Sequence, residues 1–118
     1  MTARRLLQLF AWACVAAIAT LSLVAPTWRP VTVLPHNLEH AAIFALAGFA
    51  AGLGYPARPA LTAAAFLIFS GAIELAQIPV PGRHARLSDF AIDALAACAG
   101  VGAAFVIGKL WPTRQRPA

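Results

Sequence analysis

The sequence predicts an all-α, polytopic membrane protein folded as a four-helix transmembrane bundle. Two features of the composition lead to this class: 61% of the 118 residues are hydrophobic and only 11% are charged, whereas an ordinary soluble domain carries about 25% charged residues. The third feature is the spacing of the charges, which leaves charge-free windows at 6–28, 40–57, 59–73 and 94–108. Because a helix needs about 20 residues to cross the hydrocarbon core, four spans fill the chain and leave no separate soluble domain.

The first expected span covers 6–25. Arg4 and Arg5 precede this apolar run, as basic residues do in a signal peptide. The run is longer than the roughly 7–15 residues of a signal core, so we expect a retained helix. Pro26 ends it, and Trp28 suits the headgroup layer that follows.

Proline separates the remaining expected spans, which are 37–54, 61–78 and 90–110. Pro35 biases the chain away from helix before the second span, where Asn37 is a candidate cap. Pro59 belongs to the turn before the third span, and Pro79 ends that span. Ser88 is a candidate N-cap for the fourth span.

The basic residues set the expected orientation and exclude nucleic acid as a partner. They occur singly or in pairs between apolar runs, which is unlike a phosphate-binding stripe. With the N-terminus inside, six basic residues lie on the inner side and three on the outer side, which predicts that both termini are cytoplasmic. The inner residues are Arg4, Arg5, Arg58, Lys109, Arg114 and Arg116, and the outer ones are Arg29, Arg83 and Arg86.

Small residues suggest where the helices approach one another. Gly48 and Gly52 form a GxxxG pattern in the second span, and a second ridge runs through Gly100, Ala104 and Gly108 in the fourth. Pairing of these two ridges with each other is one arrangement they allow. Cys14 and Cys98 lie within apolar runs, without the spacing of metal ligands, and we expect them to pack as small hydrophobic residues.

Ionisable residues in the spans are the main functional signal. Each costs about 2.5–3.5 kcal/mol at the centre of a membrane helix, so it needs a partner or a watery cavity. The helical rise places His40, Glu74 and Asp93 at a similar depth near the outer side. Ser70, Glu74 and Gln77 share one helix face.

We interpret these groups as the lining of an outward-facing polar pocket that binds a polar or anionic group. Arginine suits an anion, because its guanidinium offers paired donors. The expected ligand-binding residues are His40, Glu74, Gln77, Arg83, Arg86, Asp89 and Asp93. The alternative is that these groups only neutralise one another and hold the helices together.

The segment 36–40 spells H-x-x-E-H, which resembles an inverted zinc-protease motif. Glu74 could be proposed as the third ligand. Five residues at the mouth of a membrane helix lack the structural context that such a motif needs. We therefore expect no metal, no cofactor and no enzymatic activity.

The segment from His36 to Ala104 resembles the VanZ-like family of small bacterial membrane proteins. The matching pieces are His40 with Phe44 and Gly48, the sequence IELAQ at 73–77, PGR at 81–83, and Asp89 followed by Gly100. The family commonly has an Asp-Lys pair where this chain has His36 and Asn37, and an Asn where it has Asp93.

The resemblance implies one VanZ-like membrane domain over 1–118 in the bacterial inner membrane. It also implies a role in the cell envelope, because the founding member is linked to teicoplanin resistance. Expected partners are a membrane lipid, with a lipid-linked cell-wall precursor as one candidate. Two other functions stay open: a proton-coupled transporter subunit, and a structural or assembly protein without a ligand. The sequence leaves the oligomeric state undetermined.

Overall fold

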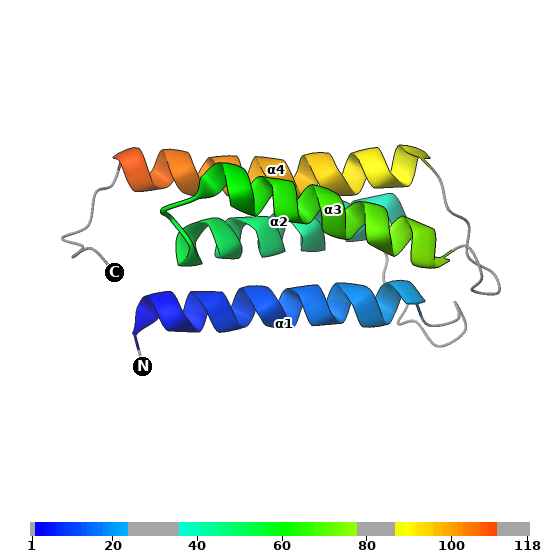
Figure 1. The fold of residues 1–118 in the computed structure, drawn as a ribbon, viewed down its shortest axis with the longest axis horizontal. Coiled ribbons are helices and arrows are strands. Elements are labelled where there is room, and N and C mark those ends of the chain that lie inside the picture. Colours follow the sequence, from blue (N-terminus) through cyan, green and yellow to red (C-terminus); the bar gives the residue numbers. More distant parts are fainter. Residues whose placement is uncertain (1, 24–35, 78–86, 111–118) are drawn as a thin grey trace.

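The computed structural model describes residues 2–23, 36–77 and 87–110, and for residues 23, 36, 37, 77 and 87–89 the backbone alone. These parts of the chain form four helices and no strand, which confirms the all-α prediction for them (Figure 1). The helices are α1 (Ala3–Leu23), α2 (His36–Gly54), α3 (Pro59–Gln77) and α4 (Leu87–Leu110). Each expected span falls on one of them.

The N-terminus of α1 lies three residues before the expected span. Thr2 explains the early start, because its Oγ1 accepts a hydrogen bond from the backbone N–H of Arg5 at 3.1 Å. Its carbonyl accepts a second bond, from the N–H of Leu6 at 3.0 Å. Thr2 thus acts as an N-cap, and α1 includes the two arginines that the sequence analysis placed before the helix.

The other three helix starts also differ from the predictions. α2 begins at His36, so Asn37 lies inside the first turn rather than at the N-cap. α3 begins at Pro59, which had been assigned to the preceding turn. Proline is well tolerated at the first helical position, because its ring fixes φ near the helical value and the missing N–H would have no partner there. α4 begins at Leu87, so Ser88 lies inside the first turn rather than at the N-cap.

Three helices in the described part of the chain are long and apolar enough to cross a membrane. The apolar stretches are Ala3–Ser22 in α1, Pro59–Ala76 in α3 and Phe90–Leu110 in α4. The corresponding stretch of α2, Leu38–Gly54, is shorter. These three helices indicate a multi-pass membrane protein. α2 has 19 residues, and at 1.5 Å per residue it is about 28 Å long, close to the thickness of the hydrocarbon core.

α2 is the central helix of the arrangement. It makes its most extensive contact with α4 and its second with α1, and within the described residues no Cα atom of α1 comes within 8 Å of one in α4. α3 packs mainly on α4 and makes smaller contacts with α1 and α2. The N-terminal end of α1, the turn between α2 and α3, and the C-terminal end of α4 lie at the same end of the molecule (Figure 1).

Glycine brings α2 and α4 together as parallel neighbours. A methyl group at Gly48 would collide with the backbone of Ala97, and one at Gly52 would lie 2.6 Å from the Cβ of Ala104. The two small-residue ridges therefore do pair with each other. Since only Gly avoids these collisions, the close approach depends on the missing side chains.

The second ridge is shorter than predicted. A methyl group at Gly100 would collide with the carbonyl of Ala45 and lie 2.7 Å from the backbone nitrogen of Phe49. No described atom lies within 4 Å of a methyl group built at Gly108. Gly108 therefore takes no part in the contact, and the ridge ends at Ala104.

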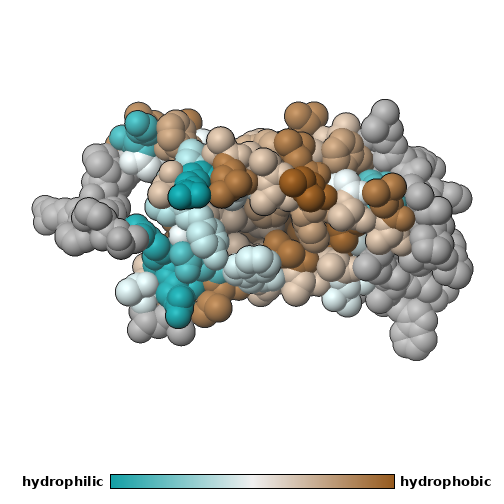
Figure 2. Space-filling view, in the orientation of Figure 1, coloured by the Kyte–Doolittle hydropathy of each residue, from teal (hydrophilic) through white to brown (hydrophobic). Residues whose placement is uncertain are grey.

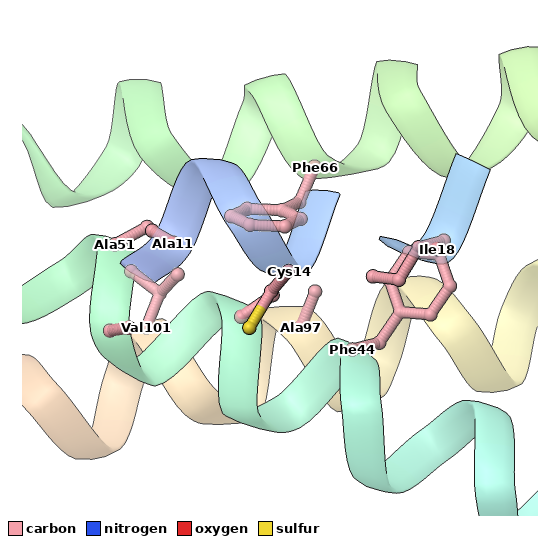
Figure 3. Packing of buried hydrophobic residues seen from close by; sticks show 10 residues of the cluster. Ala11, Cys14, Ile18, Phe44, Ala51, Phe66, Ala97 and Val101 are labelled. Carbon is pink, nitrogen blue, oxygen red and sulfur yellow. The ribbon is translucent and has the colours of Figure 1, made fainter. Parts of the chain in front are cut away.

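All four helices contribute to the hydrophobic core shown in Figure 3. Its largest fully buried side chain is Phe44 of α2, which belongs to the same cluster as Ile18 of α1. Phe66 reaches in from α3, and Val101 comes from α4. Cys14 is buried in this cluster, as expected for a thiol that packs as a hydrophobic residue.

The outer surface of the helices is also apolar. In the view of Figure 2, hydrophobic residues cover the middle of the molecule, while hydrophilic residues gather towards the end that carries the α1 N-terminus. Large hydrophobic side chains are exposed on α1, α3 and α4, and burying them in lipid removes the cost of exposing them to water. They include Leu6, Leu9, Phe10, Leu61, Leu67, Ile68, Leu75, Leu95, Phe105, Val106, Ile107 and Leu110.

Candidate functional site

Three helix ends meet where the polar residues are found. The N-terminal ends of α2 and α4 and the C-terminal end of α3 lie at the same end of the molecule (Figure 1). His40 lies four residues into α2, Glu74 three residues before the end of α3, and Asp93 six residues into α4. At 1.5 Å per residue these residues are about 5–9 Å from their helix ends.

His40 and Asp93 face each other across the α2–α4 contact. The distance from His40 Nδ1 to Asp93 Oδ2 is 3.6 Å, which is within ion-pair range and long for a direct hydrogen bond. The side chain of Asp93 is 2% exposed and that of His40 is 15% exposed. The structure therefore brings these two predicted site residues close together.

Asp93 Oδ2 is a buried acceptor that lacks a hydrogen-bond donor among the described residues. Leaving such an atom unsatisfied costs about 1–3 kcal/mol, and more for a charged group. Native structures contain few atoms of this kind, so each one calls for an explanation, such as a proton or a bound group.

The inward face of α3 carries the predicted polar stripe. Ser70 is fully buried and Glu74 is 9% exposed, together with the apolar Ile73. The Ser70 hydroxyl donates to the carbonyl of Leu67 at 3.2 Å, so it is satisfied within its own helix. Glu74 also has an interaction partner. The orientation of Ser70 and Glu74 was therefore predicted correctly.

The imidazole of His40 lies at the end of a row of aromatic rings. Its centroid lies 6.5 Å from that of Phe44, which lies 6.0 Å from that of Phe69 on α3. Phe69 in turn meets Phe66 edge to face at 6.5 Å. The polar pair thus borders directly on the core, because Phe44 belongs to the buried hydrophobic cluster.

Four of the predicted ligand-binding residues cannot be compared with the structure. Arg83 and Arg86 lie outside the described residues, and so do the side chains of Gln77 and Asp89. The anion-binding half of the hypothesis therefore stays a prediction. His36, the first residue of the zinc-like motif, has no described side chain either. Within the described part, no three His, Cys, Asp or Glu side chains come together to hold a metal ion.

Ser22 of α1 is a polar residue at this end that the sequence analysis did not select. It is 1% exposed. Gln8 defines the register of α1 against the antiparallel α2, because its side-chain amide donates to the carbonyl of Gly54 at 2.8 Å. Ser22 follows Gln8 by as many residues as His40 precedes Gly54, so Ser22 and His40 lie at the same level of these two antiparallel helices. The signal in the sequence was a hydroxyl in the last turn of an apolar helix, a turn that also holds Thr20.

The opposite end of the molecule is basic. Among the described residues, Arg4, Arg5, Arg58 and Lys109 belong to that end, and every acidic side chain belongs to the end with His40. The indole N–H of Trp12 donates to the hydroxyl of Tyr55 at 3.0 Å near the basic end. Exposed Trp and Tyr of this kind are typical of a membrane–water interface.

Chemically, the buried cluster can bind a proton or accept hydrogen bonds from a polar group. Comparison of the chain with models of protein families, with curated proteins and with solved structures finds no match.

Proposed function

We propose that this chain is a four-helix transmembrane bundle of the bacterial inner membrane that binds the polar head of a membrane lipid without chemically changing it. Both termini are cytoplasmic in this proposal, and the end with His40, Glu74 and Asp93 faces outward. A lipid-linked cell-wall precursor is the candidate ligand that fits a role in the envelope, and the resemblance to VanZ-like proteins supports that role.

The buried His40–Asp93 pair carries the proposal. The acidic side chain of Asp93 is 2% exposed, and it lies inside an assembly whose core and outer surface are mostly apolar. Ionisable residues in membrane helices are costly and usually mark a site of binding or transport. An apolar pair of the same volume would often stabilise the helices at least as well, so packing alone does not account for the choice of residues.

The separation of charge supports the orientation. Four basic residues belong to one end of the described helices, and no acidic side chain of the described part belongs there. The positive-inside rule assigns such an end to the cytoplasm. The acidic end then faces outward, where the headgroups of the outer leaflet and precursors on that side can reach it.

The depth of the site fits a headgroup rather than an acyl chain. Polar atoms about 5–9 Å from the helix ends lie close to the boundary between headgroups and hydrocarbon. The carboxylates of Glu74 and Asp93 accept hydrogen bonds from hydroxyl or ammonium groups. Arg83 and Arg86 follow α3 in the sequence and supply donors for a phosphate.

Native mass spectrometry of the purified protein tests the proposal. The wild type should carry a bound lipid, and Glu74→Gln should fold normally but lose it, because the variant keeps the shape of the side chain and removes its charge. Glu39→Gln is the matched control: it removes a partly buried carboxylate at the same end that is not in the proposed site, and it should keep the lipid.

Glu74→Leu separates binding from structural support. A binding site predicts a folded, monodisperse variant that has lost the lipid, because replacing a buried charge by an apolar group is often neutral or stabilising. A purely structural role predicts a loss of folded protein. Folded Glu74→Leu with undiminished lipid binding would refute the proposed site.

A further inference from the structure

Arginines gather at the basic end of the molecule, where the described part of the chain has no carboxylate side chain. Arg4 and Arg5 lie in the first turn of α1, and Arg58 lies between α2 and α3. Hydrophilic residues are concentrated at this end in Figure 2. Because like charges repel one another, binding of an anion among these arginines is favoured.

A tight contact between α1 and the end of α2 brings the arginines near one another. The side-chain amide of Gln8 donates to the carbonyl of Gly54 at 2.8 Å, and a methyl group built on Gly54 would lie 3.1 Å from the backbone nitrogen of Gln8. Arg4 lies one helical turn before Gln8, on the same face of α1. Arg58 follows Gly54 by four residues. Both arginines therefore lie close to one fixed contact.

Hydrogen bonds to the main chain hold Arg58 in place. Its carbonyl accepts a bond from the backbone N–H of Thr62 at 3.0 Å and another from the Thr62 hydroxyl at 2.9 Å. Arg58 itself is exposed. Since these bonds involve only its carbonyl, the guanidinium group can bind a ligand at the surface of the membrane.

Two aromatic side chains lie beside the arginines. The indole N–H of Trp12 donates to the hydroxyl of Tyr55 at 3.0 Å, and both residues are exposed. Trp12 lies two helical turns from Arg4 on the same face of α1, and Tyr55 directly follows Gly54. Trp and Tyr are enriched at the level of lipid headgroups, and long basic side chains near helix ends extend to the same level.

An apolar surface adjoins the arginines. Leu9, one helical turn after Arg5 on α1, is exposed, and so is Leu61, three residues after Arg58. Acyl chains can pack against these side chains while a phosphate group stays at the arginines. A free phosphate ion would use only the arginines, whereas a phospholipid uses both parts of the surface. The combination therefore favours a lipid.

We infer that Arg4 and Arg58, together with the Trp12–Tyr55 pair, form a binding site for the phosphate of an anionic phospholipid. Guanidinium groups offer paired donors to phosphate oxygens. A headgroup with a net negative charge, such as phosphatidylglycerol, is attracted more strongly than phosphatidylcholine, whose ammonium group offsets its phosphate. The site lies at the opposite end from His40 and does not rest on the lipid binding proposed there.

The fluorescence of Trp12 reports lipid bound at this site. When Trp28 and Trp111 are replaced by Phe, Trp12 is the only tryptophan, and brominated acyl chains quench it at short range. Bilayers of phosphatidylcholine and phosphatidylglycerol, with either lipid brominated, give the relative affinity of the two. Ser22 lies ten residues from Trp12 on α1, about 15 Å away, so lipid bound at the His40 end contributes little quenching.

This parent protein should prefer phosphatidylglycerol by about fivefold for each of the two arginines. Arg4→Gln and Arg58→Gln should each lower the preference about fivefold. Lys109→Gln is the matched control: it removes the same charge at the same end, but on α4, which has no Cα atom within 8 Å of one in α1. It should leave the preference unchanged.

The parent protein alone can decide the question, even where a variant does not fold. Equal affinity of the parent for the two lipids would overturn the inference. A loss in Lys109→Gln as large as that in Arg58→Gln would also overturn it, because the preference would then reflect net charge rather than a site. Circular dichroism identifies the variants that are folded.

Discussion

Gly100→Ala should destabilise the protein more than the addition of a single methyl group usually does. The added methyl group would collide with the carbonyl of Ala45 and lie 2.7 Å from the backbone nitrogen of Phe49. Ordinary van der Waals contact begins at 3.4 Å, so α2 and α4 would have to separate by about 0.7 Å or more. Neither obstacle is a flexible side chain that can turn aside.

The expected cost follows from this displacement. Overpacking a tight contact typically costs about 1–3 kcal/mol. Gaps of 0.5–1 Å also remove about a quarter to a half of the dispersion energy along the rest of the contact. Because the α2–α4 contact is the most extensive one in the molecule, we expect about 3 kcal/mol. That value corresponds to more than a 100-fold change in the unfolding equilibrium, at about 1.4 kcal/mol for each factor of ten.

Reversible unfolding in mixed micelles, followed by circular dichroism, measures this cost. Gly102→Ala is the matched control on the same helix, because no described atom lies within 4 Å of the methyl group it adds. Alanine is also the better helix former, so the control should be unchanged or more stable by up to about 1 kcal/mol. Equal unfolding midpoints for Gly100→Ala and Gly102→Ala would refute the close contact between α2 and α4.

Two further substitutions test the packing around the site. Phe44→Ala should lower the free energy of unfolding by about 3–5 kcal/mol in the same assay, because Phe44 is fully buried. Phe10→Ala, on the exposed side of α1, should lower it by less than half as much. Equal losses for the two variants would contradict the assigned core. Ser70→Ala should change stability by less than about 1 kcal/mol, because the hydroxyl bonds only to the carbonyl of Leu67 in its own helix, and a larger loss would show that Ser70 supports a neighbouring helix.

The positions of the helices were predictable because proline and charge mark their ends. All four expected spans fall on helices, and the errors lie at the N-termini, where a cap or a first-turn proline decides the boundary. The pairing of Gly48 and Gly52 with the ridge on α4 could also be anticipated, since small residues allow backbones to approach. That Gly108 lies outside this contact could not be anticipated, because it depends on where the two helices diverge.

The contact between His40 and Asp93 could not be predicted from spacing alone. A stripe on one helix shows which residues share a face, but not which helix that face meets. The sequence placed His40, Glu74 and Asp93 at one level, and the rotation of α4 then selected Asp93 as the neighbour of His40. Ser22 was missed for the same reason, because the register of α1 against α2 depends on the contact of Gln8 with Gly54.

The side of the membrane that carries the His40 end is central to the account. Reporter fusions after residue 118 and within 82–87 measure it directly, using one enzyme that is active only in the cytoplasm and another that is active only in the periplasm. The account predicts cytoplasmic activity at residue 118 and periplasmic activity in the 82–87 fusion. Periplasmic activity at residue 118 would contradict it, because the polar cluster would then face the cytoplasm, away from any ligand on the outer surface.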